Sequence, residues 1–136
     1  MNGKNVIGVV LVLSLFLFLI SCTGTGGGVI LAPSVPEGLS PDDLDDLQDT
    51  DTVLLLWSES TDPQDYAIHY VIAFHAGDEG ESVEQFYTTP ATSLEITQKD
   101  LFGTLEADTR YSWSVKAVNA KDVGSEFSEA ASFKTE

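Results

Sequence analysis

The chain has 136 residues, with 22 aspartates and glutamates against 6 lysines and arginines, and a formal net charge of −16. This balance argues against nucleic-acid binding, which needs basic side chains to displace counterions, and against attraction to anionic lipid headgroups. The length leaves room for one domain with one hydrophobic core, for which an aromatic content of 10% is ample.

The N-terminus has the layout of a secretory signal peptide. Met1–Asn5 carries a single lysine, and Val6–Ile20 is apolar except for Gly8 and Ser14. This run is shorter than the roughly 20 apolar residues that a membrane-spanning helix needs. A buried core helix is the alternative, but the run has no polar face and lies at the terminus. A positive head, an apolar middle and a small-residue exit favour a signal that is cleaved.

Cys22, the only cysteine, stands directly after this run. The stretch Leu19-Ile20-Ser21-Cys22 resembles the lipobox of bacterial lipoproteins, which has Leu three positions before the lipidated Cys. The resemblance implies thioether lipidation of Cys22, cleavage after Ser21 and acylation of the new amine. Stable anchoring takes two or more acyl chains, because one gives only marginal membrane residence. A single Cys excludes a disulfide within the chain, so a free buried thiol is the alternative.

The lipobox resemblance also implies a location for the mature protein. A lipidated Cys22 would hold it to the cell envelope through a membrane anchor. Thr23 stands where an Asp would suggest retention at the inner membrane of some bacteria, which points to the outer membrane or cell surface.

A Gly-rich spacer separates Cys22 from the first prolines. The stretch Thr23–Gly28 is flexible by composition, and an extended segment begins at Pro33. We therefore expect a signal peptide over residues 1–21, a tether over 22–32 and a folded domain over 33–136.

The segment Ser40–Asp51 is unusually acidic. Ser40 can cap a helix and Pro41 suits its first position, which predicts one short helical turn with Leu44 and Leu47 on one side. Calcium is the alternative use of these carboxylates, since it takes six to eight oxygens. The EF-hand spacing with its central Gly is absent, so we expect a solvated loop with neither metal nor cofactor. The candidate ligands would be Asp42, Asp43, Asp45 and Asp46.

From Val53 onward, apolar residues recur with a period of two, which is typical of strands. In the stretch 68–74, Tyr70, Ile72 and Phe74 share one face with Ile68, while His69, Val71 and Ala73 share the other. Strands are predicted over 52–57, 68–74, 83–89, 93–97, 111–118 and 130–135. Short strands between Gly, Asp, Pro and Ser clusters predict an all-β, antiparallel sandwich.

Several stretches resemble a fibronectin type III domain: PSVPEGL, VLLLW, HYVIAF and the run from Leu105 to Thr135. The last run matches the family's spacing at Leu105, Thr109, Tyr111, Val115, Ala117 and Asn119. The resemblance implies a sandwich of about seven strands with immunoglobulin-like architecture. Ala107, where the family often has Pro, and the long segment Ser40–Asp51 depart from the pattern and affect loop shape.

Tyr111 follows the turn-forming Ala107-Asp108-Thr109, which fits a tyrosine corner, whose hydroxyl bonds to upstream backbone. An immunoglobulin domain would place a Cys where Trp113 stands, so the fibronectin-like alternative is preferred. The predicted structural core and tyrosine corner comprise Trp57, Tyr70, Leu105, Tyr111 and Trp113.

No residue pattern predicts an enzyme. His69 and His75 share a strand face but lie roughly 20 Å apart, at about 3.3 Å per residue, too far for one metal ion. We expect both to be surface histidines. No Ser, His and acid motif is recognisable, and a small sandwich offers no obvious cleft for a pair of carboxylates.

The sequence therefore predicts a lipid-anchored envelope protein that presents one fibronectin type III module for protein binding or adhesion. The alternatives are a structural spacer and a carbohydrate-binding accessory of a glycan-processing system. An outer face formed by Val71 and Ala73 with Phe86 or Tyr87 is a candidate contact surface. A row of exposed aromatic side chains would favour glycan binding, and a flat apolar patch would favour protein binding. The absence of both features would favour a spacer.

We predict that Cys22→Ala leaves the precursor unlipidated, because the cysteine sulfur is the atom that would carry the thioether-linked lipid. Metabolic labelling with palmitate measures this directly. Palmitate labelling that survives the substitution would show the hypothesis to be wrong.

Overall fold

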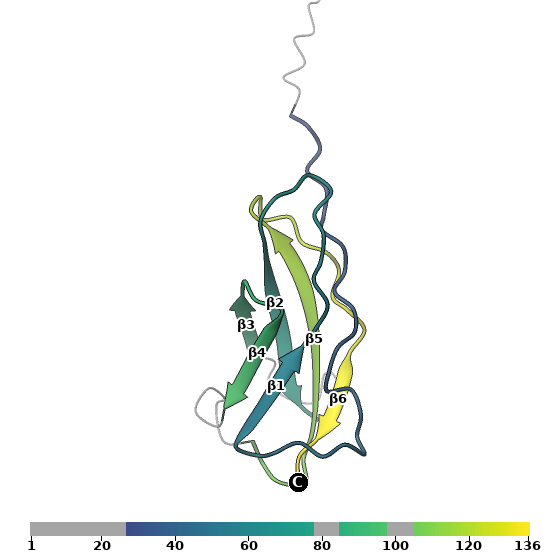
Figure 1. The fold of residues 1–136 in the computed structure, drawn as a ribbon, viewed down its shortest axis with the longest axis vertical. Helices are drawn as coiled ribbons and strands as arrows, with labels where there is room; N and C mark the ends of the chain where they lie inside the picture. The colour runs from purple at the N-terminus through teal and green to yellow at the C-terminus, as the bar shows by residue number, and fades with distance from the viewer. Residues whose placement is uncertain (1–26, 78–84, 98–104) are drawn as a thin grey trace, which may run out of the picture.

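Six strands form two antiparallel sheets in the computed structural model, which describes residues 27–77, 85–97 and 105–136. A two-stranded sheet pairs β1 (Thr52–Leu56) with β4 (Ser93–Thr97). A four-stranded sheet has the order β3-β2-β5-β6, formed by β2 (Ile68–Ala76), β3 (Gln85–Thr89), β5 (Arg110–Asn119) and β6 (Ala131–Lys134). The sheets pack face to face (Figure 1), which confirms the predicted all-β sandwich.

β2 and β5 are the two central strands of the larger sheet and pair with each other. Their register runs from Ile68 opposite Asn119 to Ala76 opposite Tyr111. Phe74 therefore lies opposite Trp113, and both side chains point into the sandwich because they share the inward phase of the period-two pattern.

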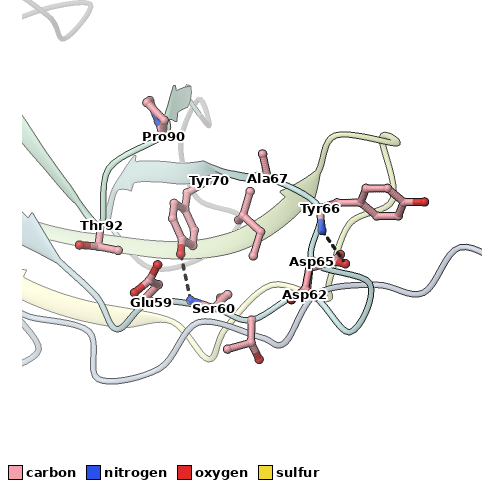
Figure 2. A pocket seen from close by; sticks show the side chains of 11 residues that line it. Glu59, Ser60, Asp62, Asp65, Tyr66, Ala67, Tyr70, Pro90 and Thr92 are labelled. Atoms are coloured by element: carbon pink, nitrogen blue, oxygen red, sulfur yellow. Dashed lines mark hydrogen bonds between the residues drawn. The ribbon is translucent and has the colours of Figure 1, made fainter.

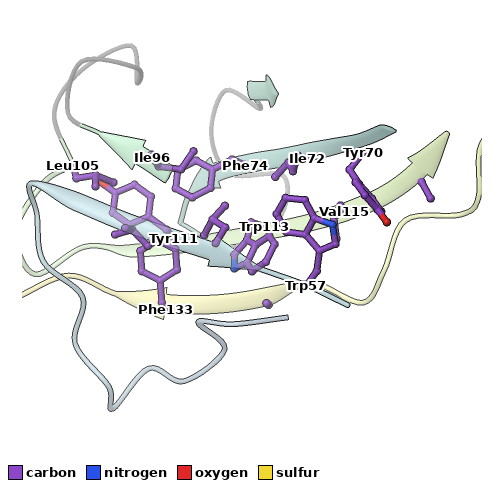
Figure 3. Close-up of a cluster of buried hydrophobic side chains, with 14 residues drawn as sticks. Trp57, Tyr70, Ile72, Phe74, Ile96, Leu105, Tyr111, Trp113, Val115 and Phe133 are labelled. Atoms are coloured by element: carbon purple, nitrogen blue, oxygen red, sulfur yellow. The ribbon is translucent and has the colours of Figure 1, made fainter. Parts of the chain in front are cut away.

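Aromatic side chains fill the space between the sheets (Figure 3). The Trp57 and Trp113 rings lie 6.1 Å apart, and Trp57 meets Tyr70 edge-on at 5.5 Å. Tyr111 stacks at 5.5 Å on both Phe74 and Phe133. The structure buries all five residues that the sequence assigned to the core and tyrosine corner: Trp57, Tyr70, Leu105, Tyr111 and Trp113.

The acidic segment does not form the predicted helical turn. Asp43 and Asp49 each accept a hydrogen bond from the backbone N–H two residues later. Such local side-chain bonds compete with helical ones. The segment also crosses between the sheets: Ser40 pairs with Leu56 of β1, and Gln48 pairs in parallel with Thr135 beyond β6. It therefore closes one side of the sandwich.

The outer face of β2 is less exposed than its alternating pattern predicted. Ala73 and His75 are both buried, so the expectation that His75 is a surface residue is wrong. Their cross-strand neighbours on β5, Ser114 and Ser112, are buried as well. These four outward-facing residues thus form a buried strip along the two central strands of the larger sheet. The apolar patch expected at Val71 and Ala73 is therefore narrow.

Neighbouring leucines of β1 give a matched test of this packing. Leu55 is fully buried and Leu54 is 49% exposed. We predict that Leu55→Ala lowers the free energy of unfolding by about 2–5 kcal/mol, because it leaves a cavity in the core. Leu54→Ala should change it by about 0.5 kcal/mol or less. Denaturant unfolding measures both, and equal effects of the two substitutions would contradict the assigned register.

Candidate functional site

The tyrosine corner lies at the end of the sandwich that carries the C-terminus. The Tyr111 hydroxyl accepts a hydrogen bond of 2.8 Å from the backbone N–H of Glu106, and burial raises the pKa of this phenol. Asp108, which has a φ of 54°, pairs with Lys134 of β6. These contacts stabilise the turn before β5. We therefore assign them a structural role rather than a binding role.

A buried amide organises the opposite end. The Asn119 side chain is fully buried and donates to the Leu31 carbonyl at 3.0 Å and to an Asp62 carboxylate oxygen at 2.9 Å. Its own oxygen accepts hydrogen bonds from the backbone N–H groups of Lys121 and Val123. One side chain thus joins the N-terminal segment, the β1–β2 connection and the turn after β5.

Asp62 extends this network into the β1–β2 connection. Its second carboxylate oxygen accepts hydrogen bonds from the backbone N–H groups of Gln64 and Tyr66. Burial raises the pKa of this carboxyl, but the hydrogen bonds from Asn119, Gln64 and Tyr66 lower it by more, so the pKa lies below 3.8. The carboxylate is therefore ionised at neutral pH and holds the connection in place.

The N-terminal segment leaves the domain at this end. In Figure 1 the described N-terminal segment lies beyond the end of β5, and the C-terminus lies at the far end of the long axis. We call the end that contains Asn119 and the β1–β2 connection the tether pole.

A pocket of about 350 Å³ opens at the tether pole (Figure 2). It is bounded by the β1–β2 connection on one side and by the start of β2 and the turn before β4 on the other. The Tyr70 hydroxyl accepts a hydrogen bond of 2.9 Å from the Ser60 N–H, and this bond links the two sides of the pocket. Nine of its eleven lining residues lie within residues 59–70, but no local pattern there predicts a pocket, whose other side is completed by Pro90 and Thr92.

The sandwich also exposes apolar side chains on its outer faces. Leu54 and Leu56 of β1 are 49% and 42% exposed, and Phe86 of β3 is 60% exposed. Phe127 is covered in part by Lys116, whose ammonium lies 4.9 Å from the ring centre. Tyr87 is half-buried and donates its hydroxyl to Gln85. The described residues thus contain no row of exposed aromatics.

The candidate calcium ligands are not brought together. Asp42 accepts a hydrogen bond from the Ser132 N–H, and Asp43 accepts one from the Asp45 N–H. Within residues 27–77, 85–97 and 105–136, no group of His, Cys, Asp and Glu is arranged to hold a metal ion. No helix in these ranges is long and apolar enough to cross a membrane. Cys22 and the predicted signal peptide lie outside the described residues.

Comparison with known proteins identifies the fold. No family model and no curated protein matches the chain. Among solved structures, the third fibronectin III domain of the human KIAA0343 protein aligns with a TM-score of 0.61, at 14% identity over 85% of this chain and 91% of that one.

Two other human domains align similarly. The fibronectin type III domain of fibronectin type III domain containing protein 3 has a TM-score of 0.56 at 22% identity, over 81% of this chain and 92% of that one. That of collagen alpha-1(XX) has the same TM-score and identity, over 81% and 91%. The chain therefore has a fibronectin type III-like fold.

The Asp62 carboxylate makes the tether pole sensitive to acid. Because its pKa is lowered on folding, its contribution to stability is present above the unfolded value of 3.8 and is lost as pH falls through the folded pKa. We predict that Asp62→Asn melts below the wild type at pH 7 and that the difference shrinks toward pH 2. Thermal melts across this range measure it.

The exposed neighbour Asp65 provides the control. Asp65→Asn should melt within error of the wild type at pH 7. A gap between Asp62→Asn and the wild type that stays constant with pH would contradict a role for the ionised carboxylate.

Proposed function

We propose that this protein is a lipid-anchored module of a bacterial cell envelope that binds another protein through the outer face of its smaller sheet. The anchor would be the lipid on Cys22, as the lipobox resemblance implies. From Cys22 to Pro36 the extended chain reaches at most about 50 Å, so the domain would stay close to the membrane.

The observation that carries the protein-binding proposal is the pair Leu54 and Leu56. Both lie on the outer face of β1, and both are more than two-fifths exposed. Leu56 is held to Ser40 by two backbone hydrogen bonds of 2.8 and 2.9 Å, so the backbone is held in place here. Exposed apolar side chains on a fixed backbone suit a protein contact, because no backbone ordering has to be added when they are buried.

A glycan-binding role has less support. Sugar rings stack on exposed aromatic side chains, and Phe86 stands without a second exposed aromatic beside it on β3. A spacer has one supporting observation: the described N-terminal segment and the C-terminus lie at opposite ends of the long axis (Figure 1). Such an arrangement would separate whatever is joined at the two ends.

Site-specific photocrosslinking in intact cells tests the proposal. A photoreactive amino acid at position 54 should give a discrete adduct with one recurring protein, identified by mass spectrometry. The same amino acid at Thr88, exposed on the outer face of the larger sheet, should not. Adducts with polysaccharide alone would favour the glycan role, and the absence of any adduct would favour the spacer.

A further inference from the structure

A groove of about 530 Å³ lies between two stretches of chain at one edge of the sandwich. One wall is formed by residues 35–39, and the other by residues 128–131, which lead into β6. In Figure 1 these two stretches run side by side, the first in dark blue and the second in yellow-green. Asp42 joins the walls at one end, because its carboxylate accepts a hydrogen bond from the Ser132 N–H. We call this space the edge groove.

The backbone of the first wall is unpaired on the side away from β1. Ser40 exchanges two backbone hydrogen bonds with Leu56, and in such a pair the neighbouring residue directs its own N–H and C=O to the opposite side. Leu39 is that neighbour, and neither of its backbone groups bonds to any described residue. The wall is nevertheless ordered, since Glu37 accepts a backbone hydrogen bond of 2.8 Å from Ser58.

The second wall does not occupy these groups. The backbone N–H and C=O of Glu129 and of Ala130 make no hydrogen bond with any described residue, and both residues are exposed. The two walls therefore face each other without pairing. An unpaired row of N–H and C=O groups at the edge of a sheet is a template for a further strand.

The side chains of the groove combine an apolar surface with negative charge. Pro36 and Ala131 are buried, and Leu39 is half-buried. Glu37 and Glu129 are exposed, and neither carboxylate has a hydrogen bond or an ion pair with any described residue. The lining contains no Lys, Arg or His. Since one glutamate lies on each wall, an occupant would meet negative charge from both sides.

These features determine the chemistry of a matching occupant. A second copy of this chain fits poorly, because a formal net charge of −16 sets two acidic chains against each other. A segment with lysine or arginine has the complementary charge. Pairing with the backbone requires that the segment be extended, in which case main-chain hydrogen bonds provide affinity and alternate side chains provide specificity.

We propose that the edge groove binds an extended, basic peptide segment of another protein by β-strand addition. The backbone of the segment pairs with the N–H and C=O of Leu39, and its basic side chains contact Glu37 and Glu129. Its apolar side chains face Pro36 and Ala131. No lining residue belongs to β1, so this site is separate from the Leu54 face and does not depend on it.

A designed peptide tests the site on the full chain in zwitterionic detergent. The probe is acetyl-Lys-Val-Lys-Val-Lys-Val-Lys-amide, which alternates basic and apolar side chains as a strand requires. We expect saturable amide shifts at residues 37–39 and 128–131. Exchange of the Leu39 N–H with water should slow about tenfold at nine-tenths saturation, because only the free protein still exposes this group.

Two control peptides separate strand addition from attraction between opposite charges. The first carries a methyl group on each backbone nitrogen, so it keeps the charge but cannot donate backbone hydrogen bonds. The second has glutamate in place of every lysine, so it keeps the strand pattern but reverses the charge. Both should bind much more weakly than the probe.

Matched variants locate the charge contacts. Glu37→Gln and Glu129→Gln should each weaken binding about two- to fivefold, as expected for loss of an exposed ion pair. Glu95→Gln makes the same change at an exposed position of β4, outside the groove, and should leave the affinity unchanged.

Several results would overturn the proposal. One is the absence of saturable binding at millimolar probe, and another is equal binding of either control peptide. An unchanged exchange rate of the Leu39 N–H at saturation would exclude strand addition. An affinity unchanged in both groove variants, with native amide spectra, would exclude the charge contacts. Shifts at the same residues when the protein alone is concentrated would assign the groove to a second copy instead.

Discussion

The side chain of Asn119 is the interaction on which the tether pole depends. It is buried at the end of the central strand β5, where an amide needs partners for both donors and for its oxygen. The structure supplies them from three separate segments: Leu31, Asp62, and the turn of Lys121 and Val123. Because an unpaired buried amide is costly, these segments are held in one arrangement. The sandwich core would form without this amide, but the loops at its end would lack a common support.

This arrangement links the fold to the proposed anchor. Leu31 accepts a hydrogen bond from Asn119, so a tether would begin at a defined point of the domain. The same network holds the β1–β2 connection, whose Ser60 N–H donates to the Tyr70 hydroxyl of β2 beside the pocket. The exposed Leu54 lies on a side face instead.

Much of the fold could be predicted from the sequence, because a period of two along each strand specifies which side chains face inward. The position of Tyr111 likewise predicted its bond to upstream backbone, since both partners are close in the chain. Contacts between distant segments were beyond this reasoning: Asp62 and Asn119 are 57 positions apart, and nothing local marks them as partners. The acidic segment was misjudged because helix-capping signals and turn-forming aspartates look alike without the strands that hold Ser40 in place. The burial of His75 is a property of the folded sheet, which the periodicity of β2 alone does not describe.

Native-state amide hydrogen exchange in Asn119→Ala tests the central claim most directly. The account predicts that exchange accelerates strongly at the N–H groups of Gln64, Tyr66, Lys121 and Val123, which depend on Asn119 or on its partner Asp62. The N–H groups of Ala73 and Ser114, which face each other in the ladder of β2 and β5, should retain much more of their protection. Acceleration by the same factor at all these positions, or no acceleration at the four pole amides, would contradict the account.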